Sequence, residues 1–127
     1  MIGRTEGLLM KEVLCAAPVA AYTIATFGAD DNTYETASSP EQPLIGVFEF
    51  ATKAAGLNVR LALDGIAHVT IAGSVNRGDR ITSNGYGQGI TADPSPGENM
   101  NVIGIAMNSG TAPAIIGVLI HQDMIQG

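Results

Sequence analysis

The side chains that could do chemistry in this sequence are few and widely spaced. Two histidines, His68 and His121, and one cysteine, Cys15, lie far apart along the chain. A structural zinc site takes four ligands in characteristic spacings, so these three residues cannot complete one without carboxylates. Each histidine falls within a strand pattern, where we expect it to be solvated or hydrogen-bonded. We therefore predict no metal site.

Several loop motifs have the composition of a functional site but not its spacing. Residues 30–35 (DDNTYE) lack the spacing and the glycine of a calcium loop. Residues 85–89 (GYGQG) lack the Lys-Ser/Thr pair of a phosphate loop. Arg77-Gly78-Asp79 fits a turn that enters a strand, and no Gly-x-Ser-x-Gly sequence indicates a serine nucleophile. We predict solvated loops and turns here, no catalytic residue and no cofactor.

The elements that hold these motifs have the two-residue period of β-strands. Apolar residues alternate with polar ones in Leu57–Leu63 and again in Ile66–Ile71. Asp64-Gly65 is a two-residue hairpin signal, which predicts that these two segments pair. Only Thr52–Ala55 is a helix candidate, of one turn at most. Further strands are predicted at residues 19–27, 44–50, 79–83, 87–91, 102–107 and 114–120, with a turn at Asn84-Gly85, a polar loop at 30–43 and burial of both faces of 114–120.

A weak internal echo links two parts of the chain. Leu44–Val47 and Val102–Ile105 both place an Ile-Gly pair before a β-branched residue, and each is followed by an apolar strand with an early glycine. Two hairpins of one design could pack as the halves of a small barrel or sandwich. The alternative is chance similarity between strands rich in glycine and valine.

The composition suits one domain whose surface carries little charge. The chain has 127 residues, and 14% of them are charged, against about 25% in an ordinary soluble domain. One interpretation is that other copies of the chain, or a large partner, cover part of the surface. The other is a polar, uncharged surface.

The charge pattern excludes some classes of partner. The net charge is −6, and the six basic residues stand apart, so we expect no binding to nucleic acid or to an anionic membrane. With no tryptophan and few aromatic residues, a stacking platform for sugars or single strands is not supported. Cys15 is the only cysteine, which excludes an intramolecular disulfide, and its apolar neighbours predict a small buried residue. An export signal is not expected, because Lys11-Glu12 interrupts the apolar N-terminal stretch.

The first twelve residues differ from the rest. Residues 1–12 place the apolar trio Leu8-Leu9-Met10 between charged residues and glycines. They fit an extended arm that becomes ordered on a partner, and they fit an ordinary edge strand equally well. The domain organisation we predict is an N-terminal arm at 1–12 and a single β domain at 13–127.

The order of motifs from Leu44 to Ile120 resembles that of a known family. A Leu-Ile-Gly-Val strand is followed by Asp64–Val69 (DGIAHV), by Val75–Ser83 (VNRGDRITS) and by Val102–Ala106 (VIGIA). This succession is similar to that of the small decoration, or cement, proteins of tailed-phage capsids. Each motif alone is ordinary β-turn sequence, and the specificity lies in their order and spacing across about 60% of the chain.

The resemblance implies a fold, a partner and a location. The fold implied is a small β-barrel or sandwich, β-tulip-like, with an extended N-terminal arm and often trimeric. The protein would bind the major capsid protein on the outer surface of the virion, after synthesis in the host cytoplasm, and would stabilise the shell by bridging its subunits. By analogy with the arms of related proteins, the candidate capsid-binding residues are Ile2, Arg4, Leu8, Leu9 and Met10.

Two other functions compete with a non-enzymatic structural role. A virion-surface binding module for a host or glycan receptor would need an exposed aromatic residue or a charged cleft. A trimeric nucleotide hydrolase would place carboxylates such as Asp64 and Asp79 at subunit boundaries, but the characteristic motifs of such enzymes are missing.

Overall fold

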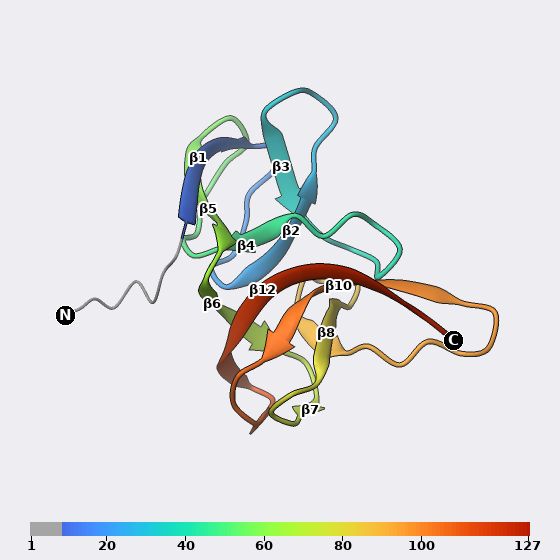
Figure 1. Cartoon of the computed structure of the whole chain (residues 1–127). Coiled ribbons are helices and arrows are strands. Elements are labelled where there is room, and N and C mark those ends of the chain that lie inside the picture. The colour runs from blue at the N-terminus through green and yellow to red at the C-terminus, as the bar shows by residue number, and fades with distance from the viewer. Residues whose placement is uncertain (1–8) are drawn as a thin grey trace.

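The computed structural model describes residues 9–127, and every regular element among them is a β-strand (Figure 1). This confirms the all-β prediction. The strands are β1 Leu9–Cys15, β2 Thr23–Phe27, β3 Thr33–Thr36, β4 Gly46–Phe48, β5 Asn58–Asp64, β6 Ile66–Ile71, β7 Ser74–Val75, β8 Arg80–Ser83, β9 Gly89–Thr91, β10 Asn99–Ala106, β11 Gly110–Thr111 and β12 Ala114–Gln126.

The strands close into two barrels, one above the other in Figure 1. The N-terminal barrel has the strand order β1-β3-β2-β4-β5, and the C-terminal barrel has the order β10-β12-β6-β9-β8. Strands β7 and β11 form a separate two-stranded sheet. Closure pairs the strands around each barrel, which removes the open sheet edges that promote aggregation.

The two barrels have the same topology. In the N-terminal barrel β1 is parallel to β3 and antiparallel to β5, while β2 and β4 complete the ring. In the C-terminal barrel β6 is parallel to β9 and antiparallel to β12, while β8 and β10 complete the ring. Strands β1 to β5 therefore correspond, in order, to β6, β8, β9, β10 and β12.

The sequence echo lies on equivalent strands of these barrels. Gly46 in β4 lies so close to β5 that an added Cβ would overlap the carbonyl oxygen of Ala62. Gly104 in β10 lies in the same relation to the carbonyl oxygen of Leu119 in β12. Both glycines allow the two backbones to approach, which explains why the Ile-Gly pair recurs. The sequence suggested that the echoing segments form the two halves of one barrel. In the structure, each segment belongs to a complete barrel of its own.

One hydrophobic core runs from the C-terminal barrel into the N-terminal one. Phe48 and Leu61 point into the N-terminal barrel, so their neighbours Val47 and Ala62 point outward. These outward residues are nevertheless fully buried, because they pack in one cluster with the interior of the C-terminal barrel, including Ile103. The outer face of one barrel therefore serves as core for the other.

The predicted hairpin at Asp64-Gly65 is wrong. Strand β5 pairs with β1 and β4, whereas β6 pairs with β12 and β9. Gly65 adopts a positive φ of 87°, as a turn glycine does, but the turn carries the chain from one barrel to the other. A turn signal reports a change of direction and does not identify the strand that will pair.

Of the other predicted elements, one pairing is confirmed and three predictions are wrong. The pairing of β8 with β9 across the loop at Asn84-Gly85 is confirmed. The polar loop expected at 30–43 contains strand β3, and Thr52–Ala55 forms no helix. Strand β12 extends to Gln126 and is not buried on both faces, since Ile115 is 51% exposed.

Candidate docking surfaces

The predicted capsid-binding residues divide between two regions. Ile2, Arg4 and Leu8 lie outside the described residues. Leu9 and Met10 belong to strand β1, where Leu9 is exposed and Met10 packs against the core shared by the barrels. The predicted arm is therefore too long at its C-terminal end, because residues 9–12 pair with β5 as part of the N-terminal barrel.

A row of apolar side chains crosses the outer face of the C-terminal barrel. Ile66 in β6 lies directly opposite Leu119 in β12, which in turn lies opposite Ile105 in β10. Leu119 is 38% exposed, and the two isoleucines are half-buried. Side chains directly opposite each other on one face of a sheet are in contact, so the three form one continuous strip.

The apolar surface extends along β12 on the same face. Ile115 is exposed and lies on the same face of β12 as Leu119, because side chains of alternate residues point the same way. Gly117 lies between them on this face. The position of an added Cβ on Gly117 lies 3.3 Å from Ile66 and 3.9 Å from Met107, so these two side chains flank the glycine. Asn108 Oδ1 accepts a hydrogen bond from the Gly117 N–H at 2.9 Å. The result is a flat patch, suited to contact with another protein surface.

A polar contact joins the two barrels at their seam. His68 in β6 donates its backbone N–H to Glu49 Oε2 at 3.3 Å, and its Nδ1 lies 3.2 Å from Glu49 Oε1. Burial raises the pKa of Glu49 above its ordinary value, and the hydrogen bonds from His68 only partly oppose this. Tyr22 packs edge-on against the His68 ring with centroids 6.1 Å apart. Its positive φ of 64° is unusual for an aromatic residue and marks local strain at the seam.

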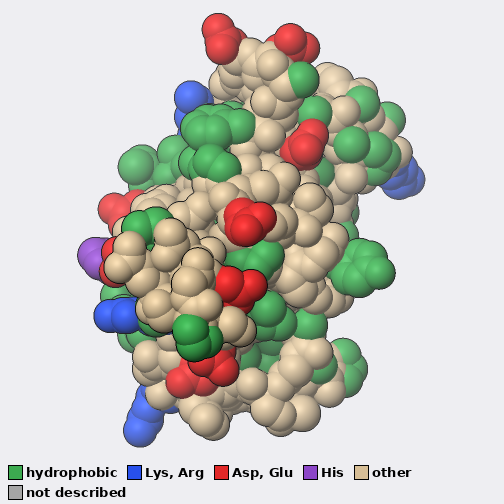
Figure 2. Space-filling model, turned by 90° about the vertical axis from the view of Figure 1, so that its right-hand side faces the viewer, with side chains coloured by type: hydrophobic (Ala, Val, Ile, Leu, Met, Phe, Trp, Pro, Cys, Tyr) green, Lys and Arg blue, Asp and Glu red, His purple; other side chains and the backbone are tan. Residues whose placement is uncertain are grey.

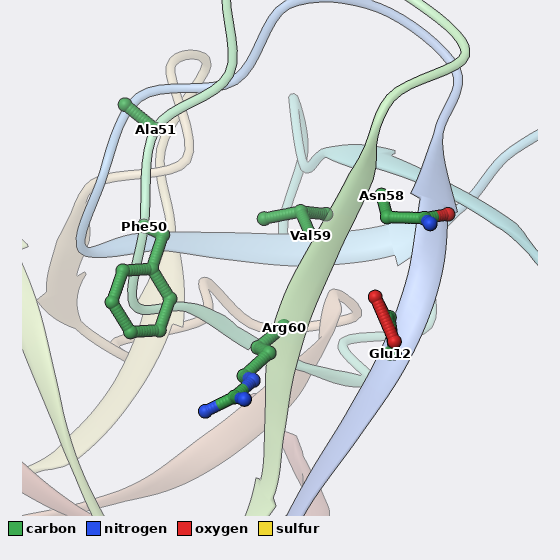
Figure 3. A pocket seen from close by; sticks show the side chains of 6 residues that line it. All are labelled: Glu12, Phe50, Ala51, Asn58, Val59 and Arg60. Carbon is green, nitrogen blue, oxygen red and sulfur yellow. The ribbon is translucent and has the colours of Figure 1, made fainter.

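A shallow pocket of about 340 Å³ lies on the N-terminal barrel (Figure 3). Glu12 and Arg60 stand opposite each other on β1 and β5, and Asn58 lies two residues before Arg60 on the same face of β5. The ring of Phe50 is 52% exposed and forms one side of the pocket in Figure 3, with the Arg60 side chain directed toward that side. An aromatic wall with charged and amide groups can hold a small polar ligand or a peptide side chain.

Acidic side chains are the more common charged side chains on the face shown in Figure 2. They run from the tip of the N-terminal barrel down the middle of that face, while lysine and arginine lie at its margins. Among residues 9–127, no group of three or more histidine, cysteine or acidic side chains is placed to hold a metal ion. Within the same residues, no helix is long and apolar enough to cross a bilayer.

The fold has a counterpart among solved structures. The sequence matches no family model, and no curated protein matches it. The structure is similar to the crystal structure of the N base of head fiber gp8.5 in bacteriophage phi29, with a TM-score of 0.65 and 17% sequence identity. The match covers 90% of this chain and 94% of that one. The two chains share a fold.

The apolar patch was missed by the sequence analysis. The run from Ala114 to Ile120 was interpreted as a strand buried on both faces, because almost every residue in it is apolar. The signal that could have identified the patch is the continuation of β12 as His121-Gln122-Asp123, which is polar on both faces and unlike a strand buried at the centre of a sheet.

Proposed function

We propose that this chain is a decoration protein that binds the outer surface of a tailed-phage capsid and stabilises it by bridging capsid subunits. The observation that carries the proposal is the fold, which matches the base of a phage head fiber over 90% of the chain. The order of β-motifs noted in the sequence supports the same class independently. The partner is the major capsid protein, and the role is adhesive and not enzymatic.

The surface of the molecule is suited to such a role. Only 14% of residues are charged, so little side-chain entropy is lost and few ions are desolvated when the surface is covered. The patch around Leu119 and the exposed Leu9 offer apolar contacts of modest size. On a capsid, such contacts are repeated by symmetry, and multivalency compensates for weak individual binding.

The test uses the phage that encodes the chain, with and without the coding sequence. Cryo-EM of the intact particles is expected to show surface density that fits the two barrels and disappears in the deletion. Deletion particles are also expected to release DNA at lower temperature, which a fluorescent DNA stain measures during heating. Identical density maps for the two particles would overturn the proposal.

A second candidate is a virion-surface module that binds a host receptor or a glycan. The pocket in Figure 3 favours it, since an exposed aromatic ring and charged groups are the features such a module needs. A glycan array probed with the chain, followed by Phe50→Ala, tests this function. Hits that the substitution abolishes would support it, and an array without hits would remove it.

A further inference from the structure

The apolar row on the C-terminal barrel has an equivalent on the N-terminal barrel. In that barrel a row of cross-strand neighbours runs across β2, β4, β5 and β1: Ile24, Val47, Ala62 and Met10. The first three side chains are fully buried, because this row is the face that packs onto the C-terminal barrel. Within the chain, the row at this position of the N-terminal barrel therefore already forms the contact with the other barrel.

The equivalence is fixed strand by strand. Gly46 lies beneath Ala62, and Gly104 lies beneath Leu119, so Ala62 and Leu119 occupy the same position. The pairing on either side then extends the match across the sheet. The C-terminal row, taken in the same order across β8, β10, β12 and β6, is Arg80, Ile105, Leu119 and Ile66. It keeps the apolar character of the first row, except at Arg80, but it is only partly covered within residues 9–127, and Leu119 at its centre is 38% exposed.

The segments that contact the row of the N-terminal barrel indicate what kind of surface binds such a row. The loop between β8 and β9, residues 84–88, lies against the Ile24 end of the row, where Gly87 O accepts a hydrogen bond from the Ile24 N–H at 2.8 Å. Thr70 N–H donates to Tyr22 O at 2.9 Å beside it. The Ile24 end of the row thus meets the hairpin loop between the second and third strands of the other barrel.

The N-terminal barrel has the equivalent loop, and it is exposed. The loop between β2 and β3 covers residues 28–32, the same length as 84–88, and lies at the tip of the molecule in Figure 1. It carries Asp30 and Asp31, both exposed, and acidic side chains mark that tip in Figure 2. Arg80 occupies the place of Ile24, the residue that meets the loop in the internal contact. A copy that docks on this loop would bring Arg80 to two carboxylates.

We infer that the exposed row is covered by a second copy of this chain, docked head to tail. The row of Ile66, Leu119 and Ile105 packs on the N-terminal barrel of the next copy, and Arg80 pairs with Asp30 and Asp31 there. The contact places the row beside the 28–32 loop of the next copy, as the internal contact places Ile24 beside the loop at 84–88. It requires the chain alone, so it does not depend on capsid binding.

The geometry sets the form of the association. Different surfaces of the two copies meet, so the contact is heterologous and builds a closed ring or an open chain of copies. The apolar strip is small compared with the roughly 800 Å² per partner of a stable protein interface. We expect reversible association in the micromolar range or weaker, reduced by salt because of the charge pairs at its edge.

Sedimentation velocity across a range of protein concentrations tests the inference. Wild type is expected to show reversible self-association. Arg80→Glu, or Asp30→Lys with Asp31→Lys, is expected to weaken it about tenfold or more, since like charges then oppose each other. An equimolar mixture of these two variants is expected to associate again, because Glu at position 80 of the first meets the lysines of the second, and Arg80 of the second meets the aspartates of the first. Wild type that stays monomeric throughout would overturn the inference.

Matched controls separate this contact from a general charge effect. Lys53→Glu and Asp93→Lys reverse charges of the same sign at exposed positions that belong neither to the row nor to the 28–32 loop, and both variants are expected to associate as wild type does. Leu119→Glu places a charge in the centre of the row and is expected to abolish association, with circular dichroism reporting the fold. If Arg80→Glu behaves like Lys53→Glu, or the mixture does not associate, the head-to-tail arrangement is wrong.

Discussion

Replacing Gly104 with alanine probes the close approach of β10 and β12. The added Cβ would overlap the carbonyl oxygen of Leu119 and would lie 2.8 Å from the Leu119 carbonyl carbon. Both atoms belong to the backbone of a strand that is paired on its other side with β6, so no side-chain rotation can relieve the overlap. One of the two strands must move.

The expected loss of stability follows from that rigidity. Overpacking a core by a methyl group typically costs about 1–3 kcal/mol when side chains can adjust. Here the backbone has to shift, which also strains the hydrogen bonds between β10 and β12 around Gly104. We therefore expect a loss at the upper end of this range, about 3 kcal/mol. For a chain of this size, that corresponds to a fall in the melting temperature of roughly 10 °C.

Chemical denaturation followed by circular dichroism measures the effect against two companion variants. Gly46→Ala makes the equivalent change in the other barrel and is expected to cost a similar amount. Gly73→Ala adds the same methyl group where no atom lies within 4 Å, and should be neutral or stabilise by about 0.5 kcal/mol. If the free energies of unfolding of Gly104→Ala and Gly73→Ala differ by less than about 1 kcal/mol, close approach of the strands does not explain the Ile-Gly echo.

Two further substitutions and one labelling experiment test other features of the fold. Because burial raises the pKa of Glu49, the stability that its protonated form contributes is complete below its ordinary pKa of 4.5 and is lost as the pH rises through the raised value. Glu49→Gln should therefore gain stability relative to wild type as the pH increases from about 4.5 to 7 in urea titrations, and a loss relative to wild type would show that the attraction to His68 dominates. Asn84→Ala removes the oxygen that accepts the N–H groups of Tyr86 and Gln88 at 2.9 and 3.0 Å, and should cost about 1–2 kcal/mol in the same assay; a cost near zero would contradict the assigned role. The buried thiol of Cys15 should react with a thiol reagent only as fast as the protein unfolds, whereas rapid stoichiometric labelling in native buffer would contradict its burial.

Local pattern was enough to predict the strands with a clear period of two. Strand β6 has the predicted bounds, and the bounds of β5 are displaced by only one residue. Strand β3 was missed because it lies in a polar stretch, and its ladder partners come from β1 and β2, which the local sequence does not indicate. Pairing of that kind is decided by tertiary packing, which overrides weak local preference.

The docking surfaces were harder to predict than the fold. The residues chosen from the family resemblance were at the N-terminus, and the described ones, Leu9 and Met10, belong to a barrel strand. The apolar row depends on three strands distant in sequence, and only their register brings Ile66, Leu119 and Ile105 together. The glycine echo was visible in the sequence, but its meaning required the position of each glycine beneath a neighbouring strand.

The core that continues from one barrel into the other limits how the protein can be dissected. The chain passes between the barrels once, at Asp64-Gly65, so a protease cut there would leave two fragments held together only by noncovalent contacts. Separated, the first fragment would expose Val47 and Ala62 to water, and the second would lose the plug that closes its interior. Neither piece is then suited to independent expression, and fusion of cargo should leave both barrels and the segment between them intact.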